Sequence, residues 1–168
     1  IKTVGVIGAG QMGSGIAHVC ALGGYDVLLN DVAGERLEKA LELGVSRSEV
    51  TVPLAQAFYE QGHYDELIAQ LQPDATATQS QRAELLVLRG HAYKMLGQRD
   101  EAAQTYRRAR AADPRYVPSI LSEADLLAEE GKRDDAGQLV EQALALAPND
   151  PAVWTRKASI AHAYGDVV

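Results

Sequence analysis

The sequence predicts a mainly α fold, a solenoid of helical hairpins preceded by a short strand-helix-strand (βαβ) unit. The solenoid follows from a repeat, because Gly97, Gly131 and Gly165 recur at one constant interval, which also separates Pro114 from Pro148. A period of about 34 residues is typical of stacked helix-turn-helix units. The βαβ unit follows from residues 1–31, where two short apolar runs flank a glycine-rich turn and a helical stretch.

The first expected element is a buried strand that leads into a phosphate-binding turn. Residues 4–7 form a short apolar run, and Gly8, Gly10 and Gly13 follow at once. In such a turn the first glycine allows a tight bend, the second lets the backbone approach a pyrophosphate, and the third lets the helix pack on the strand. The expected helix, about 11–22, would aim its N-terminal amides at the phosphates.

The second strand completes the Rossmann-like unit. Gly23 and Gly24 end the helix, residues 25–30 give the strand, and Asp31 follows at the end of that strand. An acid at this place, about 20 residues beyond the glycine turn, accepts a hydrogen bond from a ribose 2'-hydroxyl and favours NAD over NADP. The order of these elements indicates a dinucleotide-binding unit.

The stretch IKTVGVIGAGQMGSGIAHVCALGGYDVLLNDV closely resembles the N-terminus of bacterial 3-hydroxyacyl-CoA dehydrogenases, particularly of the 3-hydroxybutyryl-CoA type. The resemblance covers residues 1–32, or at most 43. It implies that NAD contacts Gly8, Gly10, Gly13 and Asp31, with Gln11 and Met12 lining the turn. The family's catalytic histidine lies in a His-aromatic-aromatic-Asn-Pro segment and pairs with a glutamate, whereas the later histidines here lie in GHYDE, GHAYK and AHAYG. We therefore expect no catalytic residue.

The rest of the chain carries the signature of the tetratricopeptide repeat family, W-x2-L-G-x2-Y, then A-x3-F, then P. In one copy the matching residues are Leu86, Gly90, Tyr93, Ala102, Tyr106 and Pro114. In the next they are Ile120, Ala124, Leu127, Ala136, Val140 and Pro148. A last copy retains Trp154, Ala158 and Ala161, and an upstream copy with Leu54, Ala55, Phe58, Gly62, Leu67 and Leu71 is one residue out of phase. The resemblance implies stacked hairpins that form a right-handed superhelix.

Residue type explains how each hairpin would form. Small residues at 90, 124 and 158, and at 102 and 136, allow two helices to cross closely. Large residues such as Tyr93, Tyr106 and Leu127 would fill the gaps between hairpins. Gly97 and Gly131 suit a left-handed turn, and each following proline breaks a second helix. Arg89, Glu123 and Lys157 stand where the family usually has leucine.

We place a domain boundary near residue 32, with the βαβ unit at 1–32 and the repeat array at 33–168. The array would comprise a junction helix at 33–43, a degenerate repeat at about 48–82, repeats at 83–116 and 117–150, and a final helix at 151–164. The first helix of the first clear hairpin is expected at about 52–61. A two-stranded parallel unit has exposed edges and little core, so it needs support from elsewhere.

Composition narrows the classes of partner. A net charge of -7 argues against nucleic acid or an anionic membrane surface as partner. A single cysteine, Cys20, excludes an internal disulfide and a cysteine-built zinc site, and no apolar run reaches the length of a membrane span. We expect a soluble protein without a metal site, cytoplasmic by default. The repeats also resemble, in composition and phase, bacterial arrays that serve envelope export or exopolysaccharide assembly.

The first functional hypothesis is a non-catalytic scaffold that holds an extended peptide or a partner helix in a concave groove. The groove would be lined by first-helix residues, namely Tyr59, His91, Lys94, Asp125, Glu129, Ser159 and His162. The groove is mixed in sign and lacks the stacked Lys and Asn array that clamps a C-terminal carboxylate in chaperone-binding repeats. An ordinary solvated face is the alternative interpretation of these residues.

The second hypothesis is an NAD-dependent 3-hydroxyacyl-CoA dehydrogenase, of which only the first βαβ unit is present. It would need a catalytic base, and the only pairing the later sequence offers is His63 with Asp65 or Glu66 in a turn. A third alternative is a chimera of two sources, because a dehydrogenase-like start joins a repeat array without a linker. In each case we expect no functional cofactor unless the N-terminal fragment is competent to bind NAD.

Overall fold

The computed structural model describes residues 3–7, 26–30 and 47–163 and divides the chain into two compact units, Ile1–Val50 and Thr51–Val168. The first unit contains two strands, β1 (Thr3–Ile7) and β2 (Asp26–Asn30). They pair in parallel, with Thr3 opposite Asp26 and Ile7 opposite Asn30. The carboxyl ends of both strands therefore meet at one edge. The expected helix at 11–22, the junction helix at 33–43 and all six residues expected to contact NAD lie outside the described residues.

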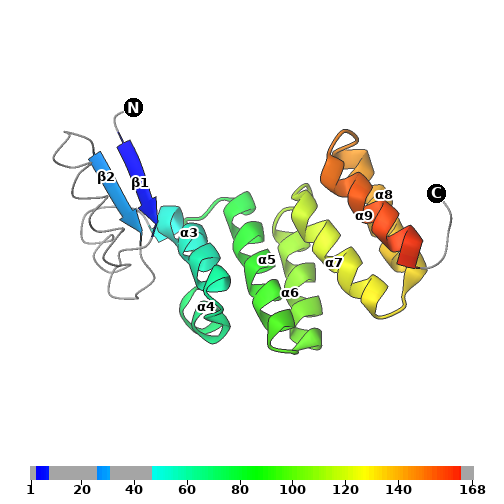
Figure 1. Ribbon diagram of the computed structural model, residues 1–168, viewed down its shortest axis with the longest axis horizontal. Helices are drawn as coiled ribbons and strands as arrows, with labels where there is room; N and C mark the ends of the chain where they lie inside the picture. The colour runs from blue at the N-terminus through cyan, green and yellow to red at the C-terminus, as the bar shows by residue number, and fades with distance from the viewer. Residues whose placement is uncertain (1–2, 8–25, 31–46, 164–168) are drawn as a thin grey trace. The chain divides into compact units, whose positions relative to one another are not determined.

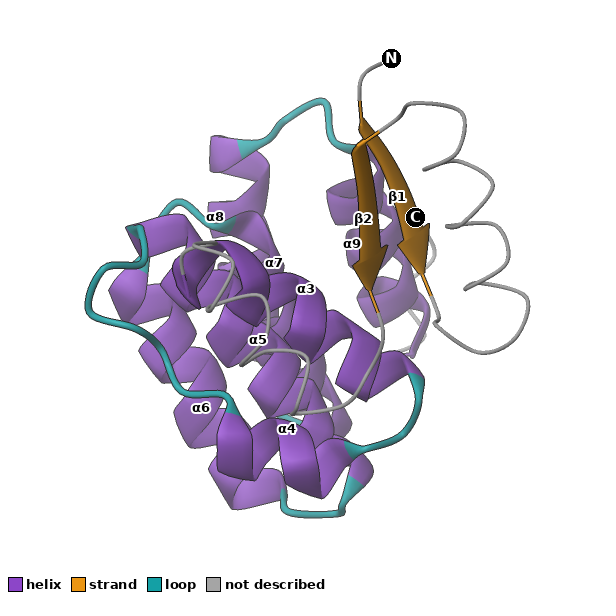
Figure 2. Ribbon diagram, turned by 90° about the vertical axis from the view of Figure 1, so that its left-hand side faces the viewer, coloured by secondary structure: helices purple, strands orange, loops and turns teal. Residues whose placement is uncertain are grey.

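The second unit is a row of antiparallel helices, which confirms the mainly helical solenoid (Figure 1). The helices are α3 (Arg47–Glu60), whose first turn belongs to the first unit, α4 (Tyr64–Gln70), α5 (Gln79–Met95), α6 (Arg99–Ala112), α7 (Val117–Glu129), α8 (Arg133–Leu146) and α9 (Pro151–Ala163). Successive helices pack as hairpins, α5 on α6 and α7 on α8, and each hairpin contacts the next. Figure 2 shows that short loops join them, and the described part of residues 51–168 contains no strand.

Turn chemistry sets where the helices end. Gly62, Gly97 and Gly131 all have φ between +76° and +77°, the left-handed region that favours glycine. At Gly97 the following N–H, of Gln98, donates to the Tyr93 carbonyl at 2.9 Å, and the Gly97 N–H donates to Lys94 at 3.0 Å. This pair of bonds is a Schellman motif, which satisfies carbonyls that the helix end would otherwise leave without partners. The left-handed turns expected at Gly97 and Gly131 are confirmed.

Local signals also explain the helix starts and stops. Thr78 begins α5 with a capping box, because its hydroxyl accepts from the Gln81 N–H at 3.2 Å and the Gln81 side chain accepts from the Thr78 N–H at 2.9 Å. The second helices α6 and α8 end two residues before Pro114 and Pro148, as expected. The first helix begins at Arg47 and not near residue 52, and it contains Pro53, which removes one backbone donor without ending the helix.

The core lies at the helix crossings. Ala102, Ala124 and Ala136 are fully buried, and a Cβ added to Gly90 would lie 2.3 Å from Cε1 of Tyr106. The small residues therefore do permit close approach between α5 and α6. One expectation changes: Leu127 is only half-buried, while its neighbour Leu126 packs with Ala102 and Tyr106. One step along a helix turns a side chain by about 100°, so the sequence pattern placed the wrong leucine in the core.

Candidate functional site

The candidate site is the surface where the first helices of successive hairpins, α5, α7 and α9, lie next to one another; we call it the inner face. The structure places Tyr59 on α3, His91 and Lys94 on α5, Asp125 and Glu129 on α7, and Ser159 and His162 on α9. The first five of these take part in three sets of contacts, which centre on His91, on Glu129 and on Asp125. Ser159 and His162 are exposed on α9, where the Ser159 hydroxyl donates to the Thr155 carbonyl of its own helix.

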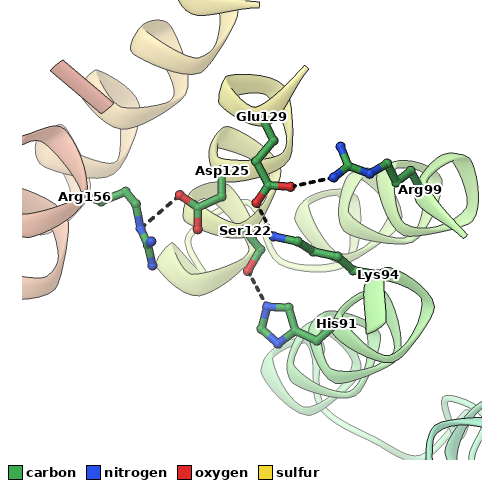
Figure 3. A network of polar contacts seen from close by, with 7 residues as sticks. All are labelled: His91, Lys94, Arg99, Ser122, Asp125, Glu129 and Arg156. Carbon is green, nitrogen blue, oxygen red and sulfur yellow. Dashed lines mark hydrogen bonds and ion pairs between the residues drawn. The ribbon is translucent and has the colours of Figure 1, made fainter. Parts of the chain in front are cut away.

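His91 is the centre of the aromatic part of the inner face. Its Nε2 lies 3.1 Å from Oγ of Ser122 (Figure 3). Its ring meets Tyr106 edge-on at 5.6 Å and Tyr59 in a tilted contact at 5.9 Å between centroids, and Tyr59 in turn contacts Tyr64 at 5.5 Å. Burial lowers the pKa of His91, and the positive charge of Lys94 lowers it further. The imidazole is therefore neutral at pH 7 and can either donate to or accept from a ligand.

A three-residue ion cluster joins α5, the start of α6, and α7. The Lys94 ammonium binds Oε1 of Glu129, and Nη2 of Arg99 lies 3.5 Å from Oε2 of the same carboxylate (Figure 3). All three side chains are at least one-third exposed, so each pair contributes little to stability by itself. The cluster instead presents a net positive charge to a ligand, because the two cations share one anion.

Asp125 links α7 to α9. Its Oδ1 lies 3.0 Å from Nε of Arg156. Burial raises the pKa of Asp125, Arg156 and Lys94 oppose that rise, and Glu129 adds to it. The guanidinium of Arg156 thus partly offsets the cost of desolvating this carboxylate.

Three members of this network, Ser122, Arg99 and Arg156, were not among the sequence-based candidates. A spacing could have found two of them, because His91 to Ser122 and Asp125 to Arg156 are both separated by 31 residues. This spacing is shorter than one repeat by three residues, and three residues make about one helical turn. Position 91 of one first helix therefore faces position 122 of the next. Arg99 gives no such signal, since it reaches Glu129 from the first turn of α6.

The charged residues that replace leucine in the repeats all bridge to the preceding second helix. Buried Arg89 donates through Nη1 to the carbonyls of Ile68, at 2.7 Å, and Leu71, at the end of α4. Burial lowers its pKa. Glu123 accepts from Nε of Arg110 at 2.8 Å. Three equivalent departures from the family pattern are therefore polar contacts between hairpins, the third of which pairs Lys157 with Glu141 at 2.7 Å.

Enzyme-like features are sparse in the part of the chain that the structure describes. Nδ1 of His63 lies 4.0 Å from Oε1 of Glu66, but both side chains are 47% exposed and adjoin a turn. The described residues contain no cluster of three or more potential metal ligands, and none of the described helices is long and apolar enough to cross a membrane. Because the glycine turn and Asp31 lie outside the described residues, the fit of NAD rests on the β1–β2 edge and the sequence alone.

Two families match different parts of the chain. The family profile of the 3-hydroxyacyl-CoA dehydrogenase NAD binding domain matches residues 3–89, just over half of the chain, and that of the tetratricopeptide repeat matches residues 93–160. A 3-hydroxybutyryl-CoA dehydrogenase of Bradyrhizobium diazoefficiens is 68% identical over 41 residues, which are 24% of this chain and 14% of the relative. The chain thus aligns with about a seventh of that enzyme's length.

Solved structures resemble the helical part. The first tetratricopeptide domain of Spaghetti (RPAP3), bound to an HSP90 peptide, superposes with a TM-score of 0.58 at 21% identity over 71% of this chain and 96% of that one. PcrH, in complex with the chaperone binding region of PopB, gives a TM-score of 0.52 at 19% identity over 80% of this chain and 99% of that one. At these identities the likeness shows the fold.

Proposed function

We propose that this chain, which belongs to the 3-hydroxyacyl-CoA dehydrogenase NAD-binding family through residues 3–89 and to the tetratricopeptide repeat family through residues 93–160, works as a non-catalytic protein-interaction scaffold. The observation that carries the proposal is the recurrence of polar contacts at fixed repeat positions on the inner face. His91 with Ser122 and Asp125 with Arg156 are the same contact made one repeat apart. A surface that repeats with the helices is suited to an extended segment that runs along it.

The charges of the inner face indicate which segment it accepts. Lys94 and Arg99 share the carboxylate of Glu129, and Arg156 pairs with Asp125, so two carboxylates offset part of the charge of three cations. An acidic C-terminal peptide would have to displace those carboxylates, whereas a segment with few charges can hydrogen-bond to the network as it stands. The half-buried rings of Tyr59 and Tyr64 offer one apolar contact beside it. We therefore propose a polar, weakly charged peptide segment with an apolar or aromatic residue as the ligand.

A display selection tests this proposal. A random peptide library is selected on the immobilised chain, and the affinity of the recovered peptides is measured by calorimetry for the wild type and for Lys94→Glu. We expect the substitution to weaken binding by about tenfold or more, because it places two carboxylates together on the inner face. The HSP90 peptide of the RPAP3 complex serves as an acidic probe, and we expect it to bind no more tightly than a scrambled peptide.

Arg108→Glu is the matched control, since Arg108 is exposed on the second helix α6 and the charge change is the same. Circular dichroism confirms that both variants remain helical. Equal loss of affinity in the two variants would mean that the peptides bind by net charge or at another surface. Retention of full affinity by Lys94→Glu would remove the inner face as the binding site.

We further propose that the dinucleotide-binding fragment, at residues 1–32, is vestigial or grafted, and that the array begins at about residue 33. The competing function is NAD-dependent oxidation of 3-hydroxyacyl-CoA, favoured by the 68% identity to a dehydrogenase over 41 residues. The His63 and Glu66 pair is a poor substitute for a catalytic dyad, because half-exposed side chains at the start of α4 do not enclose a substrate. Oxidation of NADH by acetoacetyl-CoA, followed through the absorbance of the reduced nicotinamide, is the test. Any turnover dependent on this chain would overturn the non-catalytic assignment and leave the peptide experiment unaffected.

A further inference from the structure

The contacts between first helices recur with one spacing along the inner face. Helix α5 contacts α7, and α7 contacts α9. The His91–Ser122 and Asp125–Arg156 contacts repeat the same relative placement of the two helices in each pair. Packed helices lie about 8 to 10 Å apart between their axes. A segment that crosses the inner face therefore meets a new first helix about every 10 Å.

This spacing distinguishes two conformations of a bound segment. A β-strand rises about 3.3 Å per residue and alternates its side chains, so those on one side lie about 6.6 or 13 Å apart. A polyproline II helix has three residues per turn and rises about 3.1 Å per residue, so residues i and i+3 point the same way about 9 Å apart. Of the two, the polyproline II helix places one side chain on each successive first helix.

The polar atoms that the inner face offers to a ligand are mainly donors. Lys94 and Arg99 share the carboxylate of Glu129. Arg156 binds the carboxylate of Asp125. One lysine and two arginines together carry more N–H groups than two carboxylates can accept. A polyproline II segment makes no internal hydrogen bonds, so its carbonyls are free to accept, and proline has no backbone N–H of its own.

Aromatic rings lie at the α3 side of the inner face. The ring of Tyr59 is inclined by 50° to that of His91 and by 56° to that of Tyr64, with centroids 5.9 Å and 5.5 Å apart. All three side chains are half-buried. The face of an aromatic ring carries partial negative charge and attracts the C–H groups of a proline ring. Aromatic side chains of this kind line the grooves of several domains that bind proline-rich segments.

The net positive cluster of Lys94, Arg99 and Glu129 joins α5 to α7, whereas the contact of Tyr59 with His91 joins α3 to α5. The two features are thus one helix spacing apart. We propose that the inner face binds a polyproline II segment, in which a proline lies against the Tyr59 ring and an acidic residue three positions away binds Lys94 and Arg99. This inference rests on the proposed peptide-binding function and specifies the class of its ligand.

Two isomeric peptides test the spacing. The capped heptapeptide Pro-Ala-Pro-Glu-Pro-Ala-Pro has proline three residues from glutamate on both sides, so it fits in either chain direction. Its isomer Ala-Pro-Pro-Glu-Pro-Pro-Ala has alanine at both of these positions. In calorimetry with the full chain we expect a dissociation constant on the order of 100 µM for the first peptide and at least about fivefold weaker binding of the isomer. Equal affinity of the isomers would overturn the proposal.

Two changes to the first peptide test its conformation and its charge. Valine in place of every proline favours an extended strand and should weaken binding at least about tenfold. Glutamine in place of glutamate should weaken binding about fivefold to the wild type but less than about twofold to Lys94→Gln. Arg108→Gln is the matched control, because it removes the same charge from an exposed residue of α6. The fivefold difference should persist in this control, and its loss in both variants would overturn the placement of the acidic residue.

The aromatic contact is tested by Tyr59→Leu, which keeps an apolar side chain without a ring. The difference between the two isomers should fall below about twofold in this variant, and an unchanged difference would overturn the placement of the proline. Because each result compares two peptides on one protein, a general loss of stability leaves the comparison intact, and circular dichroism verifies that the variant is helical.

The outcomes separate this inference from the function on which it rests. If library peptides bind the inner face, as judged by Lys94→Glu, while the first heptapeptide binds no more tightly than its valine version, the polyproline II ligand is wrong and the scaffold function stands. If neither the library peptides nor the heptapeptide bind the inner face, both are wrong.

Discussion

Substitution of Gly90 by alanine should destabilise the α5–α6 hairpin although alanine is the better helix former. A Cβ at position 90 would lie 2.3 Å from Cε1, 2.6 Å from Cδ1 and 3.0 Å from Cζ of Tyr106. Carbon atoms normally touch at about 3.5 Å, so the ring would have to retreat by roughly 1 Å. Tyr106 is 1% exposed and packed on all sides, which leaves it little room to do so.

The magnitude follows from two opposed terms. Overpacking of this kind costs about 1 to 3 kcal/mol, and a contact this short belongs at the upper end. Replacing a helical glycine by alanine returns about 1 kcal/mol. We therefore expect a net loss of about 2 kcal/mol, which corresponds to a fall of roughly 5 to 10 °C in melting temperature for a unit of this size.

A double-mutant cycle separates the clash from other effects. Gly90→Ala, Tyr106→Val and the double variant are unfolded with urea and followed by far-ultraviolet circular dichroism. Tyr106→Val alone should lose stability by leaving a cavity, but Gly90→Ala should cost little in its presence, because alanine and valine occupy these positions in the next repeat. Additive effects, or a Gly90→Ala variant as stable as the wild type, would refute the reasoning.

Three further predictions concern buried polar groups and the N-terminal fragment. Arg89→Leu should lower the free energy of unfolding by about 2 kcal/mol in urea titrations, although leucine is the family's usual residue, because it removes the Arg89 donor from the buried carbonyl of Leu71 and one of two donors from that of Ile68. The folded-state pKa of His91 lies below its ordinary 6.5. The contribution of the neutral imidazole to the free energy of unfolding is therefore fully present above pH 6.5 and is lost as the pH falls. Between about pH 7.5 and 5.5 the melting temperature should accordingly fall less in His91→Gln than in the wild type, and equal slopes would contradict the assignment. Calorimetry should find no saturable NAD binding at micromolar concentration, since the glycine turn, the helix N-terminus and Asp31 that the sequence predicts would together support roughly millimolar affinity. A low-micromolar dissociation constant weakened by Asp31→Ala and abolished by Gly10→Val would contradict this.

The sequence by itself determined the architecture of the helical part and the residues that end its helices. Gly97 and Gly131 adopt the left-handed conformation, and Pro114 and Pro148 follow the second helices, because backbone conformation at these positions is a local property of glycine and proline. The small size of Gly90 likewise predicted a close helix crossing, since a small residue that recurs at one helix position in every repeat lets two backbones approach. The resemblance of residues 1–32 to a dehydrogenase was equally plain in the order of its glycines.

Only the tertiary structure decided which side chains meet. Arg89 contacts the end of α4, and His91 contacts Ser122, which lies three positions short of a full repeat along the chain. In the tertiary structure Leu126 is buried, whereas Leu127 is only half-buried. Trp154 is exposed, although Ile120, one repeat earlier, is buried. These outcomes depend on the rotation of one hairpin against the next. That rotation is not a local property of the chain, because it arises from packing between segments that are distant in sequence.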